Sequence, residues 1–202
     1  EFRRVLFRSG SGVAWNGSIW VAVGSGGIPI ATSPDGITWT GRGATIFSSN
    51  GESVAWNGSI WVAVGQGGNT IATSSDGITW TSVPSATSIF AFACYGIAWN
   101  GSIWVACGSE TGIGGNVIAT SLDGITWTAR ASATSIFTTS SNGVIWTGNL
   151  WVACGTGGNV IATSPDGITW TARASATSIF TTGTGVGIAW NGNIIVAVGY
   201  GT

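Results

Sequence analysis

From residue 12 onward, short apolar runs alternate with turns rich in glycine, serine and asparagine. Residues 19–23 read Ile-Trp-Val-Ala-Val, so a strand there has apolar side chains on both of its faces. Both faces must then be covered, yet the connections are too short to hold crossover helices. We therefore expect neighbouring sheets to cover one another in an all-β protein.

Pairs of apolar runs flank a polar dipeptide, which predicts a hairpin. The dipeptide is Asn-Gly in four of the units and Thr147-Gly148 in the other. Because Asn-Gly favours a type I′ turn, we expect the first two strands of each unit, a and b, to form a tight antiparallel pair. The Asn-Gly pairs begin at Asn16, Asn57, Asn100 and Asn191.

A glycine-rich turn, a predicted strand c (Ile-Ala-Thr) and an eight-residue stretch follow in each of the first four units. The stretch Ser33–Thr40 reads Ser-Pro-Asp-Gly-Ile-Thr-Trp-Thr, which predicts a type I turn and then a strand d from Ile37 onward. We expect the aspartate to accept backbone N–H groups within its own turn, a structural role. These turn aspartates are Asp35, Asp76, Asp123 and Asp166.

The four-stranded unit recurs with nearly constant spacing. The strand-a tryptophans are 41, 43, 47 and 44 residues apart, a period typical of β-propeller blades. We predict one propeller domain of about 43-residue antiparallel blades, with four full blades and half of a fifth, as a fragment of a larger ring. The predicted ranges are 12–52 for blade 1, 53–95 for blade 2, 96–142 for blade 3, 143–186 for blade 4 and 187–202 for the half blade. A recurrent Ile-Phe pair before the next unit is expected to pack on the core.

Residues 1–11 have no counterpart in the repeat. Three of the six basic residues of the chain lie there, at Arg3, Arg4 and Arg8. We expect this segment to be a non-native or disordered leader and keep it out of the fold prediction.

The repeated turn carries a family resemblance. Ser-Pro-Asp-Gly-Ile-Thr-Trp resembles the Asp-box, or bacterial neuraminidase repeat, Ser-x-Asp-x-Gly-x-Thr-Trp, in a variant with one residue fewer between Asp and Gly. The resemblance implies a β-propeller of the sialidase-like superfamily, with the box in the turn between strands c and d. It implies a fold more than an activity, because Asp-box propellers include sialidases, other glycosidases, sorting receptors, assembly factors and phage proteins.

The composition excludes several classes of function. The net charge is −1, only 6% of residues are charged, and no basic track exists that could neutralise nucleic-acid phosphates. The absence of histidine excludes Ser-His-Asp catalysis and histidine metal sites, and the three cysteines lack paired spacing. No apolar run approaches the roughly 18 residues of a membrane span. We expect no cofactor and no metal, and the uncharged polar composition favours an extracellular or virion-surface location.

The residues outside the repeat pattern are the candidates for ligand binding. In a blade, the d-to-a and b-to-c connections emerge on one face, and these residues are predicted to lie in them. Polar residues also collect in loops without a function, and this alternative stays open. The candidates are Glu52, Glu110, Tyr95, Arg42, Arg130 and Arg173, with Tyr200 on the same face. The sialidase family's arginine triad is not expected, because the arginines follow the outermost strand and start far from the axis.

Near-identical blades favour a non-catalytic binding or structural module, because a catalytic pocket requires asymmetry. Residues 120–139 and 163–182 differ only at Leu122 and Pro165. We expect the loop face to recognise a glycan or a protein, with equivalent weak sites adding through multivalency, and we expect self-association to complete the ring. One alternative is a fragment of a sialidase-like glycoside hydrolase whose catalytic residues lie outside this chain. Another is an assembly factor or a phage or virion structural component.

Overall fold

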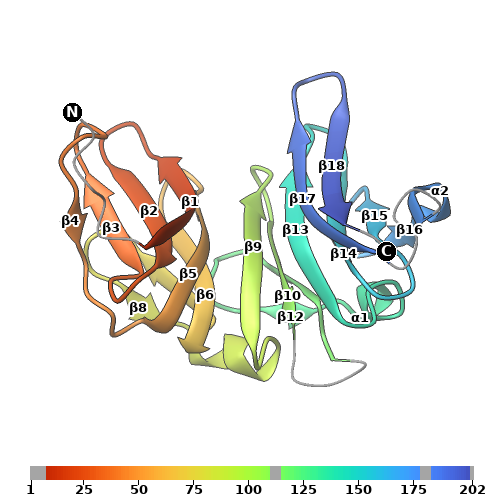
Figure 1. The fold of residues 1–202 in the computed structure, drawn as a ribbon, viewed down its shortest axis with the longest axis horizontal. Coiled ribbons are helices and arrows are strands. Elements are labelled where there is room, and N and C mark those ends of the chain that lie inside the picture. Colours follow the sequence, from red (N-terminus) through yellow and green to blue (C-terminus); the bar gives the residue numbers. More distant parts are fainter. Residues whose placement is uncertain (1–7, 110–114, 178–182, 201–202) are drawn as a thin grey trace.

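The structure is a computed structural model and describes residues 8–109, 115–177 and 183–200. Successive antiparallel strands pair in the order a, b, c, d in four consecutive units, and two further strands follow. The chain is therefore an all-β propeller of four four-stranded blades and half of a fifth, as the repeat period predicted (Figure 1).

The strands are assigned to the blades as follows. Blade 1 contains β1 (Ser9–Trp15), β2 (Trp20–Ser25), β3 (Ile30–Ser33) and β4 (Thr40–Gly41). Blade 2 contains β5 (Phe47–Trp56), β6 (Trp61–Gly68), β7 (Ile71–Ser74) and β8 (Thr81–Ser82). Blade 3 contains β9 (Ala93–Trp99), β10 (Trp104–Ser109), β11 (Ile118–Ser121) and β12 (Thr128–Ala129). Blade 4 contains β13 (Ser140–Trp146), β14 (Trp151–Thr156), β15 (Ile161–Ser164) and β16 (Thr171–Ala172).

The half blade consists of β17 (Thr184–Trp190) and β18 (Ile195–Tyr200). Short helices occupy the d-to-a connections: the 3₁₀ helix η1 (Pro84–Ser88) and the single turns α1 (Ala131–Thr134) and α2 (Ala174–Thr177). At the other end of the chain, β1 begins at Ser9, so residues 9–11 of the predicted leader are part of a strand.

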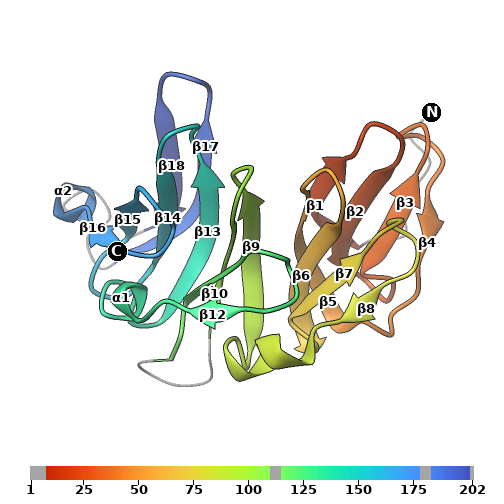
Figure 2. The same cartoon turned by 180° about the vertical axis from the view of Figure 1, so that it is seen from behind.

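Strand a is the innermost strand of each blade. The five a strands, β1, β5, β9, β13 and β17, contact one another in succession, whereas the d strands make no such contacts with each other in the described part of the chain. In both views β9 lies centrally, and the outer strands β4 and β16 lie toward opposite edges (Figures 1 and 2). The residues of strand a are therefore those nearest the axis.

The a-to-b hairpins form as predicted, but the turn is different. Four residues separate β1 from β2, and Asn16 is the first of them rather than a central residue of a two-residue type I′ turn. Its Oδ1 atom accepts the backbone N–H groups of Ser18 at 2.9 Å and Ile19 at 2.8 Å, while Gly17 adopts a φ of +97°. The asparagine side chain thus closes the loop, and Thr147 does the same with its hydroxyl, which accepts the N–H of Leu150 at 3.1 Å.

Strand d is shorter than predicted. It has two residues in each blade, and Ile37 is 59% exposed instead of lying in a half-buried strand. We call residues 33–40 and their equivalents in blades 2 to 4 the box turns, after the sequence pattern alone. Their side chains bind the backbone here, because Asp35 Oδ1 accepts the N–H groups of Ile37 and Thr38, and Trp39 Nε1 donates to the carbonyl of Gly36. The turn therefore continues to residue 39 before pairing with β3 begins.

The hydrophobic core lies between blades. One cluster joins Val21 and Val23 of blade 1 to Trp61 of blade 2, and equivalent clusters join blades 2 and 3 and blades 3 and 4. The strand-b tryptophans Trp61, Trp104 and Trp151 are fully buried. The Ile-Phe pairs also pack on the core, as predicted, with Phe47, Phe90 and Phe137 fully buried. Both faces of a blade are apolar because each face contacts a different neighbour.

Candidate functional site: a rim of bulge residues on the inner strands

Each strand a contains a β-bulge near its start, where one extra residue interrupts the pairing with strand b. In blade 2 the partners pass from Gly51 to Ser53, so Glu52 has no direct partner on β6. A bulge bends the strand and re-aims the side chain of the extra residue. The bulge residues are Ser11, Glu52, Tyr95, Asn142 and Val186, and we call this row the bulge rim.

The bulge rim is where the blades differ from one another. Each rim residue is followed by Gly or Ser, then by two apolar residues and by Trp, so its surroundings are repeated. The rim residues themselves are a hydroxyl, a carboxylate, a phenol, an amide and an aliphatic side chain. In a chain of nearly identical blades, the rim is therefore the part of strand a whose side chains differ most from blade to blade.

Side chains at the end of strand b hold the rim residues in place. Glu52 Oε1 accepts hydrogen bonds from Gln66 Nε2 at 2.9 Å and from Asn50 Nδ2 at 3.4 Å. In the next blade, the Ser109 hydroxyl donates to the Tyr95 hydroxyl at 3.2 Å. Both rim side chains are partly exposed, so they are fixed in orientation and remain accessible.

Asn142 connects two blades. Its Nδ2 atom donates to the carbonyl of Gly185 on β17 at 2.9 Å and to Thr156 Oγ1 at 3.3 Å, and its Oδ1 atom accepts from Ser140 Oγ at 2.8 Å. Thr156 Oγ1 in turn donates to Thr184 Oγ1 at 3.2 Å. Side-chain hydrogen bonds of the rim therefore join blade 4 to the half blade.

The structure places Glu52 and Tyr95 at equivalent positions of adjacent blades. Both were expected in d-to-a connections, but they lie within β5 and β9, because strand a starts earlier than the sequence pattern indicated. Tyr200, also expected in a connection, is the last residue of β18 and is 69% exposed. Glu110 lies outside the described residues.

The three arginines are not brought to the rim. Each follows strand d, separated from strand a by strands b and c. Its backbone N–H extends the pairing with strand c, as in the 2.8 Å bond from Arg130 N to the carbonyl of Ile118. Its guanidinium binds a strand-c threonine, as in the 2.8 Å bonds from Arg42 Nε to Thr32 Oγ1 and from Arg130 Nε to Thr120 Oγ1. Arg173 Nε binds Thr163 Oγ1 in the same way, at 2.7 Å.

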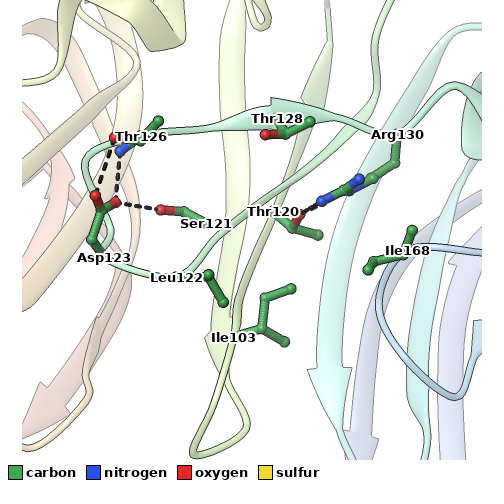
Figure 3. A pocket seen from close by; sticks show the side chains of 9 residues that line it. All are labelled: Ile103, Thr120, Ser121, Leu122, Asp123, Thr126, Thr128, Arg130 and Ile168. Atoms are coloured by element: carbon green, nitrogen blue, oxygen red, sulfur yellow. Dashed lines mark hydrogen bonds between the residues drawn. The ribbon is translucent and has the colours of Figure 1, made fainter.

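An open groove of about 450 Å³ lies beside Arg130, on the outer part of blade 3. Figure 3 shows Arg130 directed at Thr120, with Ile168 below Arg130 and with Leu122 and Ile103 further away, below Thr120. A groove of about 310 Å³ occupies the same place on blade 2. Val83, at the repeat position of Arg130, is buried in the core and does not line that groove. Because the groove recurs on blades 2 and 3, it follows from the geometry of a blade and does not distinguish one blade from another.

The turn aspartates are engaged by their own turns. Asp76 Oδ1 accepts the N–H groups of Thr79 and Ile78, each at 2.7 Å, and the hydroxyl of Ser74 at 2.9 Å. These hydrogen bonds, with that of Thr79 strongest, lower the pKa of Asp76 to about 2. An ionised carboxylate with its Oδ1 occupied in this way stabilises the turn.

Sequence reasoning missed Asn142 and the strand-b residues Gln66, Ser109 and Thr156. A signal for the rim was nevertheless present. When the units are aligned on the strand-a tryptophan, the residue four positions before it is the one that varies most in chemical type. Nothing in that alignment reveals the bulge, which depends on the register between strands.

No family model matches this sequence, and no curated protein matches it either. Solved structures do resemble it. A chain of the nidogen/laminin complex matches with a TM-score of 0.68 and 12% identity, over 97% of this chain and 74% of that one. The GH74 enzyme of Niastella koreensis matches with a TM-score of 0.58 and 21% identity, over 81% of this chain and 29% of the enzyme.

YCF48 is a third structural neighbour. The protein from Cyanidioschyzon merolae matches with a TM-score of 0.58 and 18% identity, over 90% of this chain and 59% of YCF48. YCF48 bound to D1 peptide matches with a TM-score of 0.61 and 16% identity, over 92% of this chain and 59% of that one. This chain thus spans less than two thirds of YCF48 and of the GH74 enzyme. At these identities the likeness establishes the β-propeller fold alone.

Among the described residues, no helix is long and apolar enough to cross a membrane. In the same residues, no group of three or more histidine, cysteine, aspartate or glutamate side chains is arranged to hold a metal ion.

Proposed function

We propose that this chain is a non-catalytic β-propeller module that binds an extended peptide segment of a partner protein at the bulge rim. The observation that carries the proposal is the concentration of blade-to-blade differences at one bulge position on the innermost strands. A scaffold that only needed to fold would not require a carboxylate, a phenol and an amide at the same position of three consecutive blades.

The chemistry of the rim suits a peptide backbone, which presents N–H donors and C=O acceptors in alternation. The side-chain amides of Gln66 and Asn50 both donate to Oε1 of Glu52. The other carboxylate oxygen, Oε2, has no protein donor among the described residues and can accept a ligand N–H. Tyr95 receives the hydroxyl proton of Ser109, so its own hydroxyl proton is available to a ligand carbonyl. An acceptor and a donor thus stand on adjacent blades.

A glycan ligand is less well supported by the rim. Sugars stack on exposed aromatic faces. Tyr95 is the one aromatic residue among the five rim residues and is partly buried, whereas the exposed Trp15 lies at the end of β1 remote from its bulge. A structural neighbour, YCF48, is known with a D1 peptide bound, which supports a peptide partner as the first class to test.

The non-catalytic part of the proposal rests on the carboxylates. Hydrolysis of a glycosidic bond uses two carboxyl groups about 5 to 10 Å apart on either side of the sugar. In the described part of the chain, Glu52 is the one acidic residue outside the four box turns, and each box aspartate is bound by its own turn.

The test is a selection with the whole chain against a random peptide library, with a glycan array and a fluorogenic sialoside run in parallel. We expect peptide enrichment, and we expect Glu52→Gln to weaken binding of the selected peptides about tenfold, because a charge-assisted hydrogen bond contributes about 1.5 to 3 kcal/mol. Arg130→Val, which removes the guanidinium from the outer groove and places the blade 2 residue at the equivalent position of the repeat, is the matched control and should bind like the parent.

Other outcomes would reject the proposal. Glycan binding without peptide enrichment would move the ligand class to carbohydrate. Binding lost in Arg130→Val but kept in Glu52→Gln would move the site to the outer groove. Turnover of the sialoside would favour the glycoside hydrolase alternative.

A further inference from the structure

Six Asn-Gly dipeptides occur in this chain, and the structure divides them into two kinds. Four of them open the a-to-b loops, and two lie within strand a. The dipeptide is chemically special because the glycine nitrogen can attack the amide carbon of the asparagine side chain, and glycine has no side chain that hinders the approach. The loop pairs begin at Asn16, Asn57, Asn100 and Asn191, and the strand pairs begin at Asn50 and Asn142.

The loop asparagines fold back over their own backbone. In blade 2, Asn57 Oδ1 accepts the N–H groups of Ser59 at 2.9 Å and Ile60 at 2.8 Å. These two residues directly follow Gly58, so the side-chain amide of Asn57 lies against the segment that contains the Gly58 nitrogen. The same two hydrogen bonds, with the same lengths, occur in the other three Asn-Gly loops.

The surroundings of Asn57 favour attack by the Gly58 nitrogen. Attack on Cγ places negative charge on Oδ1, and backbone donors about 2.7 to 3.1 Å from such an oxygen stabilise that charge. The Gly58 N–H has no acceptor among the described residues, and a Cβ atom at Gly58 would meet nothing within 4 Å. Gly58 and Ser59 are exposed although blade 2 has a neighbour on each side, so water reaches the reacting atoms.

The strand asparagines are held away from this geometry. Asn142 Nδ2 donates to the carbonyl of Gly185 at 2.9 Å, and its Oδ1 atom accepts the hydroxyl of Ser140 at 2.8 Å. Gly51, which follows Asn50, pairs with strand b and has so little room that a Cβ atom there would lie 2.7 Å from a backbone oxygen of blade 1. Reaction at these two sites therefore requires local opening of the sheet.

We propose that the four loop asparagines are sites of spontaneous deamidation, whereas the fold protects Asn50 and Asn142. The glycine nitrogen loses its proton to water and forms a bond to Cγ, the bond between Cγ and Nδ2 breaks, and ammonia leaves. Water then opens the resulting cyclic imide. Cleavage between the glycine nitrogen and Cγ gives aspartate, and cleavage between the same nitrogen and the main-chain carbonyl carbon gives isoaspartate. Water is the one co-reactant, and nothing is oxidised or reduced.

The reaction changes the charge of one face of the molecule. Each event adds a negative charge at the end of strand a remote from the bulge rim, in a chain whose formal net charge is only −1. An aspartate keeps an oxygen that accepts the two loop N–H groups, as Asp76 does in its box turn. Isoaspartate lengthens the main chain of the loop and moves that oxygen. The proposal is independent of the ligand at the rim.

The test is peptide mass spectrometry of the whole folded chain during incubation in mildly alkaline buffer, with chromatography that separates aspartate from isoaspartate. We expect deamidation at the four loops to be at least about tenfold faster than at Asn50 and Asn142, because only the strand sites require an opening step. In denaturant, where every site is an unfolded Asn-Gly, the six rates should become similar.

Asn57→Thr is the matched control. It copies the loop of blade 4, in which Thr147 Oγ1 accepts the N–H of Leu150, so the variant should fold, show no reaction at that loop and react normally at the other three. Two results would overturn the proposal. One is equal rates at loop and strand sites in the folded chain. The other is loop asparagines that stay intact in the folded chain but react in denaturant.

Discussion

The carboxylate of Asp76 lies 2.7 Å, Oδ1 to N, from the backbone of Thr79, and this hydrogen bond recurs in all four box turns. Backbone donors, that of the residue three positions on being the strongest, hold the pKa of Asp35, Asp76 and Asp123 at about 2, below the ordinary value of 3.8, and lower that of Asp166. The aspartates of these turns therefore stabilise the fold in their ionised form.

Acid should destabilise the protein for this reason. A carboxyl whose folded-state pKa is depressed contributes stability that is fully present above the unfolded pKa and is lost as pH falls through the folded pKa. We expect the unfolding midpoint, measured by calorimetry, to be steady near neutral pH and to fall between about pH 4 and about pH 2. Asp76→Asn, which keeps an oxygen acceptor without the titrating group, should show a shallower fall. A midpoint that is constant or rises on acidification would contradict this role.

The turns and the burial of single strands could be predicted, because each depends on residues that are close together in the sequence. The Ser-x-Asp-Gly pattern identified the turn and the role of Asp76, and the alternation around Trp61 identified a strand that is covered on both faces. The bulge at Glu52 could not be predicted, because a bulge depends on how β5 pairs with β6 and not on the residues of β5 alone.

The candidate site was predicted only in part for the same reason. Glu52 and Tyr95 were selected because they depart from the repeat, and the structure places them at equivalent positions. Arg130 departs from apolar patterning too, but its guanidinium is directed to a threonine ten residues earlier on the adjacent strand. Side-chain direction at a strand end depends on the neighbouring strand, which the sequence pattern does not specify.

Replacing Trp61 by alanine should be far more costly than replacing Trp20. Both tryptophans start strand b, and each stacks at about the same distance on a strand-a tryptophan, with centroids 5.1 Å apart for Trp56 and Trp61 and 5.0 Å for Trp15 and Trp20. Trp61 is fully buried against blade 1, whereas Trp20 is half-buried and packs against no other blade on that face in the described residues. We expect losses in unfolding free energy of about 3 to 5 kcal/mol for Trp61→Ala and below about 2 kcal/mol for Trp20→Ala.

Chemical denaturation of the two variants and the parent would measure the difference in unfolding free energy. Equal losses would mean that the core does not lie between the blades.

Gly77→Ala should be more destabilising than Gly36→Ala. Both glycines have a φ of +76°, so the strain of a left-handed alanine, about 1 to 2 kcal/mol, is common to both variants. A Cβ atom on Gly77 would lie 3.1 Å from Val21 Cγ2 of the preceding blade and 3.2 Å from Trp61 Nε1, whereas on Gly36 the nearest atom is Trp20 Nε1 at 3.5 Å. We expect Gly77→Ala to lose roughly a further 1 to 3 kcal/mol from overpacking.

The comparison isolates the contact between blades, because the turn itself is the same in both variants. Denaturation midpoints that shift equally would show that the box turn fits against the preceding blade without a steric limit.

The cysteines should report how the blades open. Cys94, Cys107 and Cys154 are buried free thiols. Burial raises the pKa of all three, that of Cys154 to about 12, so very little reactive thiolate exists at neutral pH. We expect slow alkylation by iodoacetamide in the native protein and rapid alkylation in denaturant, followed by mass spectrometry.

The order of modification tests the fold further. Cys107 is in the core cluster between blades 3 and 4, while Cys154 lies under the two-stranded half blade, where a Cβ on Gly185 would come within 2.8 Å of its Cβ atom. Two strands have fewer contacts to break than a full blade, so local opening should expose Cys154 first. Modification of Cys107 before Cys154 would mean that the half blade is held at least as firmly as the complete blades.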